Sequence, residues 1–276
     1  MPHFSNGGRR LHFSDDNPNH GEPLLLLHGL GSRGTDWGPQ INGLANEYRV
    51  LTLDFPGHGD SDPIHAPVSM ADLAGDVRAL LDHLQIPRAH VVGLSLGGMV
   101  LFQLLADSPD RLRSITVINS GPGLTSGQWR MSFLVAFRTL LIRTFGLPML
   151  AKKIAPKLFP HKEQQPLREA FLSSIDAVDT DSYVRVLRAI GDFNVCAEVA
   201  GSQMPALILS ADNDYTPVSY KAEYVATLGN ARLSVIKNSG HASPMDSPDV
   251  CNQLIRDFLS DHVEQEVRPL EAVITN

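Results

Sequence analysis

The sequence predicts an α/β fold, in which a mostly parallel sheet is covered by helices on both faces. Three observations lead to this fold class. Short apolar runs alternate along the chain with longer segments of helical periodicity. Runs such as "PLLLL" at residues 23–27 are apolar throughout, as expected of strands covered on both sides. The alternation stops after residue 121 and returns near residue 203, which indicates an inserted helical segment.

The elements of the first half follow from local patterns. Asn6-Gly7 lies between two short runs and predicts a hairpin, because Asn-Gly suits a turn with positive φ. Apolar residues at helical spacing follow Ser69, which is expected to cap that helix. The later expected elements are, in order, strands at 23–29 and 48–55, a helix at 69–86, a strand at 89–94, a helix at 96–109 ending near Pro109, and a strand at 114–120.

The second half begins with a segment that shows no buried strand. Its apolar residues recur at helical spacing, and four prolines are expected to separate its helices. The prolines are Pro148, Pro156, Pro160 and Pro166, and the expected helices are 129–146, 167–175 and 181–193. Then follow a strand at 205–211, a helix at 218–229, a strand at 231–240 and a helix at 249–263. We therefore divide the chain into a core, residues 1–121 and 203–276, and a helical cap, residues 122–202.

Composition limits the classes of function. The chain has 276 residues with a formal net charge of -7, which argues against nucleic acid or an anionic membrane as the main partner. Two cysteines do not suggest a disulfide framework, and neither a secretory signal nor a membrane span is visible. No metal-binding motif is present. We expect a cytoplasmic monomer or homodimer that binds a small-molecule substrate without metal or cofactor.

A G-x-S-x-G pattern at residues 93–97 is the most informative chemical signal. It lies between an expected strand and an expected helix. A serine on such a turn has a strained backbone and an exposed hydroxyl, and the glycines let strand and helix approach closely. A tight connection without a chemical role would give the same letters, but the strand–turn–helix context favours Ser95 as a nucleophile.

A serine nucleophile needs a base to take its proton and an acid to orient that base. His241 follows the last expected strand, where the chain order Ser, Asp, His requires the base. The preceding strand is followed by two carboxylates, Asp212 and Asp214. We prefer Asp214 as the acid, because it lies farther past the strand, and assign Asp212 to turning the loop. The choice between them stays open at this point.

The glycine-rich stretch after the first buried strand has two interpretations. Residues 29–34 spell G-x-G-x-x-G, and Asp54 follows about twenty residues later, which is the outline of a dinucleotide-binding site. Such a site needs an unbroken helix from the second glycine, whereas a Gly-Pro pair at 38–39 interrupts it. We therefore interpret "HGLG" as an oxyanion loop, in which the backbone N–H groups of Leu30 and Leu96 bind the oxyanion.

Together these motifs resemble the α/β-hydrolase family. The similarity rests on "HGLG", "DFPGHGDSD", "GLSLGG", "DNDYTP" and "SGHASP", in the family's order, within residues 20–120 and 203–262. It implies an eight-stranded, mostly parallel sheet with a helical cap between strands six and seven. It also implies that Ser95 is the nucleophile, His241 the base and Asp214 the acid.

The resemblance implies a serine hydrolase, for which we expect a small or medium, partly apolar ester or lactone substrate. Haloalkane dehalogenases and epoxide hydrolases are similar but have aspartate at the elbow. A C–C bond hydrolase or a thioesterase would use the same triad, and a non-catalytic small-molecule receptor would share the fold. The loop containing His58 is usually structural in the family, so we expect His58 to be non-catalytic. The candidate pocket residues are His28, Gly29, Trp129, Phe133 and Phe137.

Overall fold

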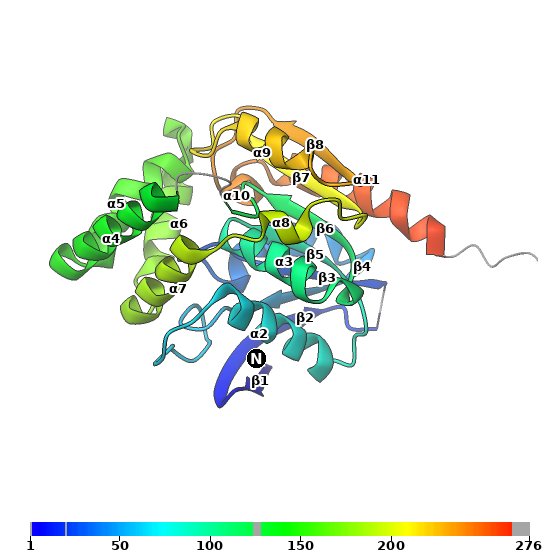
Figure 1. The fold of residues 1–276 in the computed structure, drawn as a ribbon, viewed down its shortest axis with the longest axis horizontal. Helices are drawn as coiled ribbons and strands as arrows, with labels where there is room; N and C mark the ends of the chain where they lie inside the picture. The colour runs from blue at the N-terminus through cyan, green and yellow to red at the C-terminus, as the bar shows by residue number, and fades with distance from the viewer. Residues whose placement is uncertain (1, 20, 124–127, 267–276) are drawn as a thin grey trace, which may run out of the picture.

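An eight-stranded sheet runs through the molecule. The computed structural model describes residues 2–19, 21–123 and 128–266. The strands are β1 His3–Asn6, β2 Arg9–Asp16, β3 Glu22–Leu27, β4 Tyr48–Leu53, β5 Ala89–Leu94, β6 Leu112–Ile118, β7 Ala206–Ala211 and β8 Ala231–Ile236. Their spatial order is β1-β2-β4-β3-β5-β6-β7-β8 (Figure 1). The pairs β1–β2 and β2–β4 are antiparallel and the others are parallel, which confirms the predicted sheet.

Helices cover both faces of this sheet. They are α1 Gly38–Leu44, α2 Met70–His83, α3 Leu96–Asp107, α4 Gln128–Phe145, α5 Leu147–Leu158, α6 Gln165–Ile175, α7 Thr180–Asp192, α8 Cys196–Val199, α9 Val218–Val225, α10 Ser243–Asp246 and α11 Pro248–Glu266. Successive leucines of β3 alternate between the faces. Leu25 and Leu27 belong to the core cluster that includes α2 and α3. Leu24 and Leu26 belong to the cluster that includes α1 and α11. Within the described ranges, no helix is both long and apolar enough to cross a membrane.

The helices α4 to α8 connect β6 to β7. Val135 and Ile142 of α4, Leu150 of α5 and Leu187 of α7 share a separate hydrophobic cluster. Figure 1 shows α4, α5, α6 and α7 gathered beyond one end of the sheet. In contrast, Val199 of α8 packs into the core of the sheet. The division into a core and a cap at residues 122–202 remains our prediction.

Four helices were missing from the sequence prediction, namely α1, α5 and the short helices α8 and α10. α1 begins at Gly38 and places Pro39 in its first turn, where the missing proline N–H has no intrahelical partner to lose. α5 was missed because its prolines were expected to separate helices. Pro148 does lie in a first turn, but Pro156 lies inside α5, so that expectation was wrong for Pro156. The proline removes a single backbone bond near the end of the helix, while buried Leu150 and Ala155 hold α5 in place.

Two local predictions of the first half are confirmed. Gly7 and Gly8 have φ of 54° and 78° in the turn between β1 and β2, as an Asn-Gly hairpin requires. Ser69 is the N-cap of α2, and its side chain accepts a hydrogen bond from the Asp72 N–H at 3.2 Å. Turn and cap residues were readable from sequence because their hydrogen bonds are made within a few residues.

The buried carboxylate of Asp54 fixes the loop that follows β4. Its Oδ1 accepts the Gly34 N–H at 2.6 Å and its Oδ2 accepts the Asp60 N–H at 3.0 Å. Nδ1 of His12 lies 2.7 Å from the same Oδ2. Burial alone would raise the pKa of Asp54, but His28, the two N–H groups and His12 lower it overall. Asp54 therefore braces the loops after β3 and β4.

His58 is fully buried within the same loop. Its Nδ1 lies 3.1 Å from the carbonyl oxygen of Pro56, and its Nε2 has no hydrogen-bond partner among the described residues. Burial, followed by the neighbouring His28, lowers the pKa of His58 from 6.5 to about 3. The ring is neutral in the folded protein at pH 7, which suits a structural position.

We expect the free energy of unfolding of His58→Gln to fall less steeply between pH 7 and 4.5 than that of the wild type. Because the folded-state pKa lies below the unfolded one, the contribution of His58 is complete above pH 6.5 and falls as the pH drops toward 3. The slope is up to about 1.4 kcal/mol per pH unit for one group. Urea unfolding between pH 7 and 4.5 measures it. His65 is exposed, so the control variant His65→Gln should keep the wild-type slope. An unchanged slope in His58→Gln would contradict the assignment of His58 as a buried, neutral histidine.

Candidate active site

Ser95 lies on a sharp turn between β5 and α3. Its φ of 53° and ψ of -110° fall in a backbone region that residues other than glycine rarely adopt. The neighbouring glycines permit this turn. A Cβ on Gly93 would lie 2.4 Å from the carbonyl oxygen of Gly97, and one on Gly97 would lie 2.1 Å from that of Leu27. The strand and the helix thus meet at backbone distance, as the G-x-S-x-G pattern predicted.

Two backbone N–H groups flank this serine. Leu96 is the first residue of α3, and Leu30 lies in the loop after β3. Neither N–H donates to an acceptor within residues 2–19, 21–123 and 128–266. The two segments are joined, because the Gly97 N–H donates to the carbonyl oxygen of His28 at 3.1 Å. Leu30 and Leu96 remain our candidates for binding an oxyanion beside Ser95.

The side chain of His28 supports this loop from inside the protein. Its Nδ1 lies 2.8 Å from the carbonyl oxygen of Gly29, and its Nε2 accepts the Phe55 N–H at 3.0 Å. Burial lowers the pKa of His28, against a smaller opposing effect of Asp54. Since both ring nitrogens are engaged and the ring is buried, we assign His28 to holding the loop rather than to the pocket.

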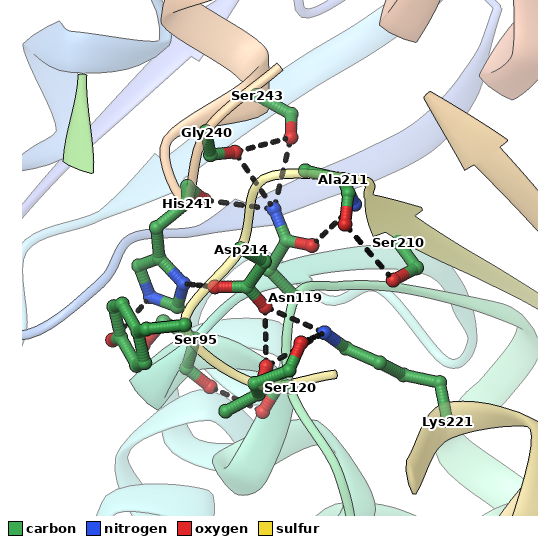
Figure 2. Close-up of polar contacts among 12 residues, drawn as sticks. Ser95, Asn119, Ser120, Ser210, Ala211, Asp214, Lys221, Gly240, His241 and Ser243 are labelled. Atoms are coloured by element: carbon green, nitrogen blue, oxygen red, sulfur yellow. Dashed lines mark hydrogen bonds and ion pairs between the residues drawn. The ribbon is translucent and has the colours of Figure 1, made fainter. Parts of the chain in front are cut away.

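His241 lies in the loop between β8 and α10, with its ring against Asp214. The Nδ1 atom of His241 is 2.6 Å from Oδ1 of Asp214. The backbone of His241 is also fixed, because Nδ2 of Asn119, after β6, donates to its carbonyl oxygen at 2.8 Å. Figure 2 shows Asp214 between His241 and Lys221, with Ser95 on the same side as the imidazole ring. An imidazole whose Nδ1–H is held by a carboxylate presents Nε2 as the proton acceptor.

The carboxylate that contacts His241 is that of Asp214 and not that of Asp212. The side chain of Asp214 is fully buried, and its Oδ2 accepts hydrogen bonds from Nζ of Lys221 at 2.5 Å and from the hydroxyl of Thr216. Burial alone would raise the pKa of Asp214, but His241 and then Lys221 hold it at about 2. Asp212 is exposed and accepts the Ser239 N–H at 3.2 Å, which ties two loops together.

A tyrosine that the sequence analysis did not consider occupies the free side of the imidazole. The hydroxyl of Tyr215 lies 2.7 Å from Nε2 of His241, and the two rings stack with centroids 4.1 Å apart. The ring is half exposed, while the burial of its hydroxyl end and the charge of Asp214 raise the pKa of Tyr215. Within the described residues, Tyr215 therefore occupies Nε2 of His241, and Ser95 and His241 share no direct hydrogen bond.

Tyr215, Lys221 and Asn119 are the site residues that sequence reasoning missed. Tyr215 directly follows Asp214, so its position in the chain was a usable signal. Lys221 is fully buried although it lies on a helix with exposed neighbours. No pattern in the sequence distinguishes it from a surface lysine. Asn119 follows β6, and no motif in the sequence marks it as part of the site.

The other predicted pocket residues lie in different surroundings. A Cβ on Gly29 would lie 3.6 Å from Cβ of Ser95, so Gly29 adjoins the serine. Phe133 and Phe137 on α4 are exposed, at 70% and 48%. The side chain of Trp129 lies outside the described residues. A groove of about 540 Å³ between α4 and α7 is lined by Val135 and neighbouring residues and does not include Ser95.

Among the residues that the structure describes, no group of three His, Cys, Asp or Glu side chains is placed to hold a metal ion. The site consists instead of a hydroxyl, an imidazole, a carboxylate and two free backbone N–H groups. This set can transfer a proton from an oxygen and stabilise a negative oxygen beside it.

A family model and several known proteins are similar to this chain over most of its length. The family model described as alpha/beta hydrolase fold matches residues 22–248. The 3-oxoadipate enol-lactonase 1 of Acinetobacter baylyi is 26% identical over 256 residues, which cover 91% of this chain and 94% of that protein. The dihydrolipoyllysine-residue acetyltransferase component of the acetoin cleaving system of Pseudomonas putida is 29% identical over 266 residues, covering 93% and 68%.

Solved structures give a similar result. The crystal structure of the enol-lactonase from Burkholderia xenovorans LB400 is 26% identical in sequence and superimposes with a TM-score of 0.87. The match covers 94% of this chain and 100% of the enol-lactonase chain. The similarity thus extends over both the sheet and the helices inserted between β6 and β7.

Proposed function

Because the chain belongs to the α/β-hydrolase family and is a hydrolase, we propose that it cleaves a carboxylic ester or lactone through an acyl-enzyme on Ser95. The substrate is small or medium in size and partly apolar. The observation that carries the proposal is the contact of His241 with the buried Asp214, at 2.6 Å, beside a strained serine. A structural serine would have no need of this arrangement.

The first half of the reaction forms the acyl-enzyme. Ser95 Oγ attacks the carbonyl carbon while its proton passes to Nε2 of His241. The carbonyl oxygen becomes negative and is bound by the N–H groups of Leu30 and Leu96, which have no other acceptor in the described structure. His241 then gives its proton to the leaving alcohol oxygen as the carbon–oxygen bond breaks.

The second half repeats these steps with water. His241 takes a proton from a water molecule, whose oxygen attacks the acyl carbon of the ester on Ser95. The same two N–H groups bind the oxyanion, and the proton returns to Ser95 Oγ as the acid is released. Asp214 stays ionised throughout, because its pKa of about 2 lies far below the working pH.

The choice of ester or lactone is supported by the relatives. Two of the similar proteins are named enol-lactonases, and each matches over more than nine tenths of this chain. Both are only 26% identical to it, so the individual substrate is not carried over. The common feature is a carbonyl carbon bonded to an oxygen leaving group.

The hydroxyl of Tyr215 must leave Nε2 of His241 before Ser95 can donate to that nitrogen. Its half-exposed ring can turn toward solvent without opening the core, whereas the buried His241 cannot. We assign the contact of Tyr215 with His241 to the protein without substrate. Binding of the carbonyl group beside Ser95 displaces the hydroxyl of Tyr215 and lets the serine donate directly to Nε2.

A serine-directed fluorophosphonate should label the unmutated protein at Ser95. Ser95→Ala should abolish the adduct and lower kcat on p-nitrophenyl esters or lactones by about 10⁶, and His241→Ala by a similar factor, because the groups act as a unit. Mass spectrometry of the labelled peptide and a panel of ester chain lengths provide the measurements. Absence of an adduct on the unmutated protein would overturn the proposed function and favour a non-catalytic receptor.

Asp214→Asn should lower kcat by about 10⁴, because the imidazole loses its orienting carboxylate. Asp212→Asn is the matched control two residues away in the same loop. It should stay within about tenfold of the wild type, since the Asp212 side chain contacts only loop residues and not His241. Steady-state kinetics of the two variants compare them directly. Equal losses would remove Asp214 from the assigned role.

Tyr215→Phe should keep kcat within about tenfold of the wild type, because the hydroxyl leaves before proton transfer. A lower KM is expected as well, since substrate no longer displaces a hydrogen bond. The alternative is a proton relay from Ser95 through Tyr215 to His241. In that case the phenylalanine variant would lose about as much kcat as His241→Ala, which steady-state kinetics would reveal at once.

A further inference from the structure

Lys221 lies fully buried on α9, on the side of Asp214 opposite His241 (Figure 2). We propose that Lys221 is a positioning residue that fixes the carboxylate of Asp214, and with it the imidazole of His241, and that presents His241 with an ion pair in place of an uncompensated carboxylate. The proposal rests on the proposed function. It adds a fourth member to the site, acting through Asp214 without touching the reacting atoms.

The ammonium group of Lys221 has a complete set of partners on a single loop. Its Nζ donates to Oδ2 of Asp214 at 2.5 Å, to the carbonyl oxygen of Thr216 at 2.6 Å and to the hydroxyl of Thr216 at 2.6 Å. These three acceptors match the three protons of an ammonium group. The geometry therefore holds Lys221 in its charged form, although burial lowers its pKa against the opposing effect of Asp214.

The same contacts orient the carboxylate. Oδ2 of Asp214 is held by Lys221 and Thr216, which leaves Oδ1 for Nδ1 of His241. Each oxygen atom thus has a different task. Rotation of the carboxylate would break bonds on both sides at once, so Lys221 fixes the position of the imidazole through Asp214.

The charge of Lys221 also bears on the base strength of His241. A buried carboxylate alone beside an imidazole stabilises the imidazolium and raises the histidine pKa. A lysine bound to the other oxygen cancels much of that field, because the imidazole then faces an ion pair of zero net charge. Removal of the Lys221 charge would therefore leave the imidazole facing an uncompensated carboxylate.

Several described elements contribute ionisable groups near the pair. Besides Asp214, the phenol of Tyr215 faces His241 and is uncharged at neutral pH. Asp246 of α10 accepts the N–H of Gly240 at 2.6 Å, and the charge of Arg138 on α4 affects the pKa of Tyr215.

Other groups lie around α9. On the strands under this helix, Arg232 of β8 forms an ion pair with Asp261 at 3.1 Å. On α9 itself, Tyr220 and Tyr224 have raised pKa values caused by burial and stay neutral.

The test compares Lys221→Gln with Lys221→Arg. The glutamine amide can still donate to Asp214 but carries no charge, whereas arginine keeps the charge. For the glutamine variant, the acid limb of the kcat/KM profile should move to higher pH by about one unit. The arginine variant should retain the wild-type limb. A merely structural role would lower kcat/KM by the same factor at every pH and would leave the limb in place.

A second measurement does not depend on catalysis. The titration of the His241 ring, followed by NMR and assigned with His241→Gln, should shift upward in Lys221→Gln and not in Lys221→Arg. Thermal unfolding checks that the variants are folded, and Lys221→Met provides a further uncharged variant should the glutamine variant not fold. An unshifted ring titration in a folded, uncharged variant would overturn the proposal.

Failure of the two proposals can be told apart. If the fluorophosphonate labels Ser95 but the His241 titration is unchanged in Lys221→Gln, only the role of Lys221 is lost. If the unmutated protein is neither labelled nor active, the proposed function is lost, and with it the assignment of Lys221 as a residue that acts on catalysis. The ring titration then measures only an electrostatic coupling.

Discussion

The arrangement of the site depends on the buried carboxylate of Asp214, whose negative charge needs hydrogen bonds and an opposite charge inside the protein. An ionised side chain removed from water loses several kcal/mol of solvation unless hydrogen bonds and opposite charge replace it. Asp214 obtains them from His241, Lys221 and Thr216. Because these donors come from different segments, the requirement to satisfy one carboxylate draws the loop after β8, the helix α9 and the loop after β7 together. Stability of the loop and geometry of the site are consequences of the same bonds.

A second constraint is the close contact between β5, β3 and α3. Glycine at positions 93 and 97 is what allows the backbone of α3 to reach the carbonyl oxygen of Leu27. That contact fixes Ser95 in a conformation that costs about 1 to 3 kcal/mol, which the surrounding packing has to supply. The sheet therefore serves as a rigid base for the strained backbone of Ser95.

These two constraints differ in how far they could be predicted from sequence. The hairpin at Gly7 and the cap at Ser69 depend on contacts within a few residues, so short motifs were sufficient. The turn at Ser95 also needs the contact with Leu27, but the glycines that permit this contact are part of the G-x-S-x-G pattern. The contact of His241 with Asp214 spans 27 residues and could be expected only from the order of the strands. Lys221 could not be foreseen, because helical periodicity assigns a lysine to the surface unless its partner is known. α5 was missed for a related reason. Its lysines and Pro156 indicate an exposed, interrupted segment, although one face of the helix is buried.

A single loop after β7 controls several properties of the imidazole together. Asp214 orients the ring, Tyr215 covers its free nitrogen, and Thr216 completes the set of acceptors for Lys221. Because these residues are consecutive, a change in the loop's backbone would move all of them. Access to Nε2 and orientation of the ring are therefore coupled through the backbone between β7 and α9.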